Sequence, residues 1–258
     1  MISKNMTLSN IRVKRAGRII LNIEKLQIDA GDFIAIIGSN GAGKTTLLRL
    51  CCGLIKPTSG TIKLDGKDFT GFSSWAKSNL RKRIGYVPQQ AEYNPDLPFT
   101  LREIIAMGRA GTKPLLQKLE REDYRIVDDW IEKIGLSCNR NQTFRSLSGG
   151  EQQKALIARA MVQNPQVLML DEPCSNLDIN WKYQITEIIE QLYKMTNVTV
   201  LMVSHDTSLL PDVCRRAVLL NKGNLVADGD IDSRKMVIGF AARNVKSVMQ
   251  NETSIATE

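Results

Sequence analysis

The chain has 258 residues, of which 43% are hydrophobic and 24% are charged, and its formal net charge is +8. This composition excludes a disordered chain, a fibre and a coiled coil, and it is typical of one large globular domain or two smaller ones. No apolar run approaches the roughly 20 residues that span a bilayer, and the N-terminus has no long apolar segment, which predicts no secretory signal. The positive charge is compatible with nucleic acid, an anionic membrane surface or a nucleotide as a partner.

The sequence predicts two short strands at 6–13 and 19–28, separated by a polar turn, and a hairpin over 217–229. Apolar runs predict buried strands at 33–37, 167–170 and 198–203. The run at 33–37 is apolar throughout, which is typical of a strand buried on both faces of a parallel sheet, and a helix is predicted after it over 44–52. Strands that alternate with helices predict an α/β fold, with a mostly parallel sheet and an antiparallel β subdomain.

The middle of the chain has a different pattern. Helices are predicted over 101–107 and 122–134, and the second has apolar residues at 126, 127, 130, 131 and 134, so that one face is buried. We interpret about 93–160 as a helical insertion within a domain that covers 1–230. The remaining residues, 231–258, are predicted to form a C-terminal helix and tail.

Residues 38–45 fit the phosphate-binding pattern G-x-x-x-x-G-K-[ST], between a predicted strand and a predicted helix. Glycines let successive backbone N–H groups surround phosphate oxygens at the N-terminus of that helix. In such a loop Lys44 contacts the β- and γ-phosphates, and the Thr45 hydroxyl holds Mg²⁺. The residues predicted to bind nucleotide here are Gly38, Ser39, Asn40, Gly41, Ala42, Gly43, Lys44, Thr45 and Thr46.

Polar residues at the ends of other strands are candidates for the same site. Asp171 and Glu172 follow the strand at 167–170, where one carboxylate can hold Mg²⁺ and the other can orient a water molecule. His205, the single histidine, follows the strand at 198–203. A lone histidine is usually structural, but one at a strand end can also face the γ-phosphate of the same nucleotide. Gln89 follows another strand, and its amide reaches either the metal and water or only its own loop.

The segment Ser148-Gly149-Gly150-Glu151 precedes a helix with an apolar face, predicted over 154–162. It has two interpretations. Small residues at a helix N-terminus form an anion-binding nest, but a serine at this position is also an ordinary helix cap. Taken alone the segment favours the cap, whereas next to the first phosphate loop it indicates a nucleotide held from both sides.

In this combination and order, these segments resemble the nucleotide-binding subunit of an ABC transporter over about residues 6–230, with Leu147–Glu151 as the signature and 175–178 as the D-loop that contains Asp178. The resemblance implies a head-to-tail dimer with two ATP molecules, each between the phosphate loop of one copy and Ser148, Gly149, Gly150 and Glu151 of the other. It makes Glu172 the general base, His205 a γ-phosphate contact, and Thr45, Gln89 and Asp171 the residues around Mg²⁺. It also places Arg15 at the position of an adenine-stacking ring.

The resemblance further implies that the helical insertion docks onto two separate transmembrane permease subunits, at the inner, cytoplasmic face of the cell membrane. The stretch 98–109 is similar to importers of iron-siderophore complexes, haem and cobalamin, which work with an external substrate-binding protein. Two alternatives stay open: a soluble ATPase of the same type without a permease, and the ATPase subunit of an exporter or a membrane-remodelling system. Nucleic acid is not expected as a partner.

Overall fold

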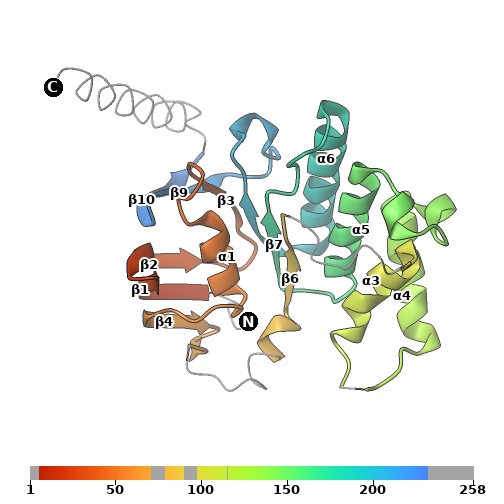
Figure 1. Ribbon diagram of the computed structural model, residues 1–258, viewed down its shortest axis with the longest axis horizontal. Helices are drawn as coiled ribbons and strands as arrows, with labels where there is room; N and C mark the ends of the chain where they lie inside the picture. The colour runs from red at the N-terminus through yellow and green to blue at the C-terminus, as the bar shows by residue number, and fades with distance from the viewer. Residues whose placement is uncertain (1–5, 71–78, 90–97, 115, 232–258) are drawn as a thin grey trace.

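The computed structural model describes residues 6–70, 79–89, 98–114 and 116–231 (Figure 1). These residues form a 10-stranded sheet. In sheet order its strands are β5 (Lys67–Asp68), β4 (Ser59–Leu64), β1 (Met6–Arg15), β2 (Arg18–Ile28), β10 (Asn224–Asp230), β9 (Arg216–Asn221), β3 (Phe33–Ile37), β8 (Thr199–Val203), β7 (Val167–Asp171) and β6 (Ile84–Val87). The predictions for 93–97 and 232–258 lie outside the described residues.

The sheet has a parallel part and an antiparallel part, as the sequence predicts. Strands β6, β7, β8, β3 and β9 pair in parallel, whereas β5, β4, β1 and β2 are antiparallel, as is the hairpin of β9 and β10. The two parts meet where Asn22 lies opposite Asn224, and their side chains share a 3.0 Å hydrogen bond. Strand β4 is not predicted, because only Ile62 and Leu64 mark its alternation.

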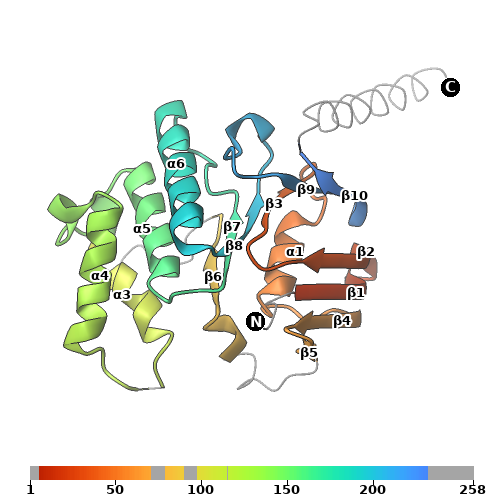
Figure 2. The same ribbon diagram turned by 180° about the vertical axis from the view of Figure 1, so that it is seen from behind.

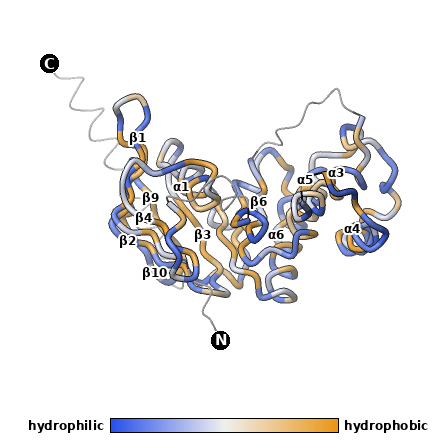
Figure 3. Tube along the Cα trace, turned by 90° about the horizontal axis from the view of Figure 1, so that it is seen from below, coloured by the Kyte–Doolittle hydropathy of each residue, from blue (hydrophilic) through white to orange (hydrophobic). Residues whose placement is uncertain are grey.

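Strand β3 separates two hydrophobic cores because successive side chains of a strand point to opposite faces. Phe33 and Ala35 belong to the core beneath the helical region. Ile34 and Ile36 belong to the core shared with the antiparallel strands and the first helix. In Figure 3 the tube near the β3 label is mostly orange, the colour of hydrophobic residues. Burial on both sides explains why the run at 33–37 has no polar residue.

The helices flank the sheet. They are α1 (Lys44–Cys51), α3 (Leu101–Ala110), α4 (Arg121–Lys133), α5 (Gly149–Met161) and α6 (Ile179–Thr196). Figures 1 and 2 show α3 and α4 beyond α5, at the end of the molecule away from β1 and β2. The predicted apolar face of α4 is confirmed, since Val127, Trp130 and Ile131 are buried. Within the described residues, no helix is both long and apolar enough to cross a membrane.

Helices α3 and α5 approach closely at Gly108. A Cβ atom added there would lie 2.0 Å from the carbonyl oxygen of Arg159 and 2.6 Å from Cγ2 of Val162. Real Cβ atoms do not approach backbone so closely, so a side chain at this position would push the two helices apart. The glycine therefore sets how the helical region packs on α5.

We expect Gly108→Ala to lower the free energy of unfolding by about 1–3 kcal/mol, the usual cost of overpacking a close contact. Urea denaturation followed by circular dichroism measures this change. Gly111→Ala is the matched control, because its added Cβ would be no closer than 3.4 Å to any neighbour. Equal stability of the two variants would contradict the assigned role of Gly108.

A buried carboxylate ties the α3–α4 connection together. Asp123, in the first turn of α4, accepts hydrogen bonds from Arg109 at 2.8 Å and from the backbone of Glu120 at 3.0 Å, and its second oxygen lies 2.8 Å from Nζ of Lys113. Burial opposes ionisation of this carboxyl, but the hydrogen bonds from Lys113, Glu120 and Arg109 outweigh it and hold its pKa well below the usual range. The charged form is therefore the one that stabilises the fold.

We expect Asp123→Asn to destabilise the protein by at least about 2 kcal/mol near neutral pH, because both cations lose their partner. A depressed carboxyl pKa contributes stability above its unfolded value of about 3.9, and this contribution is lost as pH falls toward the folded value. The difference from wild type is thus constant from about pH 5 to 8 and shrinks below about pH 4. Urea titrations at several pH values measure it, with exposed Asp129→Asn as the control.

Candidate functional site

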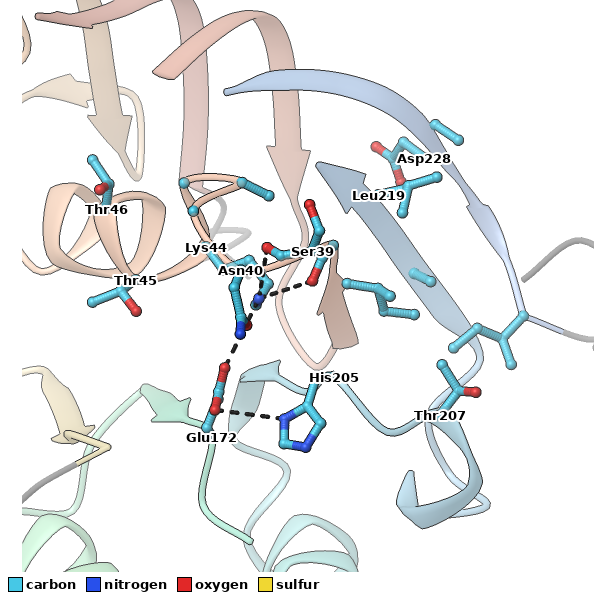
Figure 4. A pocket seen from close by; sticks show the side chains of 18 of the residues that line it. Ser39, Asn40, Lys44, Thr45, Thr46, Glu172, His205, Thr207, Leu219 and Asp228 are labelled. Atoms are coloured by element: carbon cyan, nitrogen blue, oxygen red, sulfur yellow. Dashed lines mark hydrogen bonds and ion pairs between the residues drawn. The ribbon is translucent and has the colours of Figure 1, made fainter. Parts of the chain in front are cut away.

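A cavity of about 1040 Å³ lies at the carboxyl ends of the parallel strands. Its lining combines the loop before α1 with residues from five other places in the chain: Ile20, Gln89, Glu172, His205 with Thr207, and the β9–β10 hairpin. All of the predicted phosphate-loop residues, 38–46, line this cavity. Parallel strands end at the same edge of the sheet, which is why segments far apart in sequence meet here (Figure 4).

Two glycines allow the backbone of the phosphate loop to take its conformation. A Cβ at Gly38 would lie 2.3 Å from the carbonyl oxygen of Leu220 in β9. Gly43 has a φ of 100°, in the left-handed region that favours glycine, and caps the N-terminus of α1. Backbone N–H groups at that helix terminus are suited to phosphate, as the sequence predicts.

The side chain of Lys44 folds back onto the phosphate loop. Its side chain is 6% exposed, and Nζ donates hydrogen bonds to the carbonyls of Gly38 at 2.8 Å and Ser39 at 3.1 Å. The same nitrogen lies 3.8 Å from Oε1 of Glu172. A desolvated ammonium at the centre of the nest interacts strongly with phosphate oxygens, because water screens it little.

Thr45 and Asp171 are joined by a hydrogen bond of 3.0 Å from the threonine hydroxyl to Oδ1. The Tyr86 hydroxyl donates to the other carboxylate oxygen at 3.3 Å. Asp171 is buried, and burial raises its pKa while these two hydrogen bonds oppose the shift. Burial likewise raises the pKa of Tyr86 to about 12, so the phenol stays a donor. Sequence reasoning did not identify Tyr86 as part of the site.

These residues fit a magnesium ion. A hydroxyl, a carboxylate and the Gln89 amide oxygen are the hard oxygen donors that Mg²⁺ prefers. Among the described residues there is no group of three or more His, Cys, Asp and Glu side chains that could hold a metal. Mg²⁺ in proteins usually takes its remaining ligands from phosphate and water.

Glu172 is the centre of the polar side chains in the cavity. Its Oε2 accepts a hydrogen bond from Nε2 of Gln89 at 2.9 Å and lies 3.5 Å from Nδ1 of His205, as Figure 4 shows for the histidine. The side chain is 14% exposed, whereas His205 is 57% exposed. Glu172 has a φ of 51°, a strained value for a non-glycine residue, which turns the chain directly after β7. The structure thus brings Lys44, Gln89, Glu172 and His205 together.

The signature segment lies elsewhere. No residue of 148–151 is among those that line the cavity in the described chain. Ser148 and Glu151 form a capping box at the N-terminus of α5, with Ser148 Oγ bonded to Glu151 Oε2 at 2.9 Å. The helix therefore begins at Gly149, five residues earlier than 154, because the capping box starts it there. Within one chain the cap interpretation is confirmed, and nucleotide contact in a second copy stays a prediction.

Asp178 and Gly150, two of the predicted residues, both contact Trp181 of α6. Asp178 caps α6, and its carboxylate accepts the backbone N–H of Trp181 at 3.0 Å. Trp181 in turn covers Gly150, where an added Cβ would lie 2.0 Å from the indole ring. The signature is thus packed against the first turn of α6, which Asp178 caps.

Arg15 is exposed at the end of β1 and is not among the residues that line the cavity. Ile20 in β2 lines it instead. Thr207, Leu219 and Asp228 also belong to the lining and were missed, because no local motif marks a residue that only the sheet topology brings to a site.

Comparisons with known proteins agree with this geometry. A family model described as ABC transporter matches residues 21–175. A probable metal transport system ATP-binding protein of Chlamydia muridarum is 33% identical, over 86% of this chain and 90% of the relative. The petrobactin import ATP-binding protein FpuC of Bacillus anthracis is 36% identical, over 79% of this chain and 73% of the relative.

Solved structures give the same result. A dimeric ATP-binding cassette, MJ0796, in a post-hydrolysis state bound to ADP and Pi, is 27% identical with a TM-score of 0.76, over 88% of this chain and 98% of that one. The structure of cbiO1 from Clostridium perfringens, part of the ABC transporter complex cbiONQ, is 25% identical with a TM-score of 0.78, over 96% and 99% of the two chains.

The phosphate loop and the carboxylate of Glu172 line one cavity, and Asp171 accepts a hydrogen bond from Thr45 of that loop; together they define a P-loop nucleotide hydrolase. Within that class, this chain belongs to the ABC transporter family. It is an ATPase of that family, and its hydrolysis of ATP is coupled to transport.

Proposed function

We propose that this chain is the ATP-hydrolysing subunit of an importer that takes up a metal-containing cargo. Its position is the inner face of the cell membrane, where two copies bind two permease subunits and an external protein delivers the cargo. Support for import comes from relatives that are named for petrobactin import, zinc uptake and metal transport. An iron complex, haem or a cobalamin-type molecule is the cargo class that we favour, from the stretch 98–109 and from the petrobactin relative.

One observation carries the catalytic part of the proposal. The carboxylate of Glu172 and the ammonium of Lys44 lie 3.8 Å apart in the cavity that holds the phosphate loop. A general base and a phosphate-binding cation are thus available to the same γ-phosphate. Mg²⁺, held by Thr45, Asp171 and Gln89, supplies charge neutralisation of the phosphate oxygens when it is bound.

The hydrolytic step follows from these positions. Glu172 accepts a proton from the attacking water while the water oxygen forms its bond to the γ-phosphorus, and the bond from that phosphorus to the β–γ bridging oxygen breaks. Lys44 stabilises the negative charge that spreads over the phosphoryl oxygens and the leaving ADP. His205, beside Glu172, contacts the γ-phosphate and orients it. The products are ADP and inorganic phosphate.

The coupling to transport depends on a second copy of the chain, which completes the nucleotide site. The signature residues Ser148–Glu151 lie outside the cavity of their own chain, so a head-to-tail partner is the source of the second phosphate-binding nest. ATP then joins the two copies, and loss of the γ-phosphate removes the charge that holds the seam closed. Gln89 transmits closure to the helical region, which docks on the permease.

The proposal is tested by isolating the complex from native membranes. The tagged Glu172→Gln variant with ATP, which holds the dimer closed, is recovered from detergent extract, and mass spectrometry identifies its partners. We expect a polytopic permease and then, in proteoliposomes that contain this permease and the wild-type chain, ATP hydrolysis stimulated by an iron chelate, haem or cobalamin. A free divalent cation as the only stimulating cargo would correct the cargo class. Recovery of soluble partners or nucleic acid alone would refute the transporter assignment for this chain.

A further inference from the structure

The residues of the loop after β8 alternate between two kinds of contact. His205 and Thr207 line the nucleotide cavity, and both side chains are labelled in Figure 4. The residues on either side of them, Ser204, Asp206 and Ser208, hydrogen-bond to one another. Alternate side chains of this loop therefore face the cavity, while the others hold the loop in its conformation.

Ser204 forms the first of these internal contacts. Its hydroxyl donates a hydrogen bond to the backbone carbonyl of Asp206 at 2.7 Å and accepts one from the backbone N–H of Asp206 at 3.1 Å. Ser204 is 9% exposed, so water competes little for these two bonds. The hydroxyl thus holds the two peptide groups that directly follow His205.

The backbone of Ser204 is itself attached to the strand of the phosphate loop. Its N–H donates to the carbonyl of Ile36 at 3.2 Å, two residues before Gly38. In the neighbouring pair of strands, the N–H of Glu172 donates to the carbonyl of Val203 at 3.2 Å. A loop held at Ser204 is therefore held relative to both the phosphate loop and the catalytic carboxylate.

The direction of the His205 side chain depends on this backbone, because packing restrains the imidazole little. The side chain is 57% exposed, and its Nδ1 lies 3.5 Å from Oε2 of Glu172. Exposed side chains keep much of their rotamer freedom. The far end of the loop is fixed as well, since the carboxylate of Asp206 accepts the N–H and the hydroxyl of Ser208 at 3.0 and 2.6 Å.

We propose that Ser204 is a positioning residue for ATP hydrolysis: its hydroxyl fixes the backbone that follows His205 and thereby directs the imidazole toward the γ-phosphate beside Glu172. This inference rests on the proposed function, because it takes the contact between His205 and the γ-phosphate as given. It assigns a role to a side chain that is not itself among the residues lining the cavity in the described chain.

Substitutions of Ser204 test this role through the rate of phosphate release. Ser204→Ala should lower kcat about 10- to 100-fold, because a shift of about 1 Å in a catalytic contact has an effect of this size. ATP binding, measured by calorimetric titration, should change little, since the phosphate loop is intact. Ser204→Thr keeps the hydroxyl and should restore kcat. Ser204→Cys keeps the size of the side chain but hydrogen-bonds weakly, so it should act as Ser204→Ala does without leaving a cavity.

Thr196→Ala is the matched control. Its hydroxyl also donates to a backbone carbonyl at 2.7 Å, but it lies in the last residue of α6 and does not line the cavity. We expect this variant to keep the wild-type kcat. All assays are run well below the thermal midpoint of each variant, so that a loss of rate does not report unfolding.

Nuclear magnetic resonance gives a readout that a merely structural role would not move. His205 is the single histidine of the chain, so ¹³C labelling of histidine in a protein without a histidine tag gives one Cε1–H cross-peak from the ring. We expect this cross-peak to shift in Ser204→Ala and Ser204→Cys, and to keep its wild-type position in Ser204→Thr and Thr196→Ala. A wild-type position in Ser204→Ala would overturn the proposal.

A double variant separates this inference from the proposed function. His205→Gln should lower kcat at least as far as Ser204→Ala, and adding Ser204→Ala to it should cause no further loss, because a positioning residue acts only through the residue that it positions. A further tenfold loss, or equal kcat in Ser204→Ala and Ser204→Thr, would overturn the inference alone. Wild-type kcat in His205→Gln would refute the γ-phosphate contact itself, and the inference with it.

Discussion

Glu172→Gln should lower the rate of ATP hydrolysis by a factor of about 10²–10⁴, the usual contribution of a general base. The amide keeps the shape and the hydrogen-bonding capacity of the side chain, so the contacts with Gln89 and His205 persist. It cannot accept the proton of the attacking water. Binding of ATP is therefore retained while turnover is lost, and the variant should accumulate as an ATP-bound dimer.

Phosphate release measures the first effect, and titration with a fluorescent ATP analogue measures the second. Glu190→Gln makes the same chemical change at a glutamate of α6 that pairs with Lys194, and it should leave turnover unchanged. Hydrolysis at the wild-type rate in Glu172→Gln would remove Glu172 from the chemistry. A loss of both binding and turnover would instead assign it a role in holding the nucleotide.

Lys44→Met should weaken ATP binding and lower turnover by roughly 10²–10³, because the variant loses the cation that meets the developing phosphoryl charge. The effect is large since the ammonium is 6% exposed and lies among backbone carbonyls, where water does little to screen it. Methionine has a similar length and preserves the packing of the stem.

Calorimetric titration with ATP and a phosphate-release assay check this expectation. Lys194→Met, at a lysine that is 61% exposed in an i,i+4 pair, is the matched control and should bind ATP as the wild type does. A thermal midpoint near that of the wild type shows that the loss is not unfolding. Tight ATP binding by Lys44→Met would contradict the assigned phosphate contact.

Local motifs account for much of the site. The loop 38–45 is recognisable because its function depends on consecutive residues: glycines that allow close backbone approach, then a lysine and a hydroxyl at a helix N-terminus. Asp171 and Glu172 are recognisable because two acidic residues directly follow an apolar run. The strand at 33–37 and the apolar face of α4 could also be predicted locally, because burial imposes a hydrophobic pattern on a few neighbouring residues.

Other parts of the site have no such local pattern. Arg15 aligns with a base-stacking position, yet the fold leaves it outside the cavity and places Ile20 there. Tyr86 joins the site only through its hydrogen bond with Asp171, across two paired strands. The start of α5 at Gly149 depends on the capping box of Ser148 and Glu151, which lies before the apolar pattern at 154–162.

The class of fold, the family and the phosphate loop could be predicted from the sequence alone, because each of these depends on side chains that are neighbours along the chain. Tertiary contacts were needed to show that Gln89 and His205 converge on Glu172 and that Ser148–Glu151 are not among the residues that line the cavity of their own chain. Strand order and register set these placements. They depend on pairings between residues up to 202 positions apart, which no local pattern encodes.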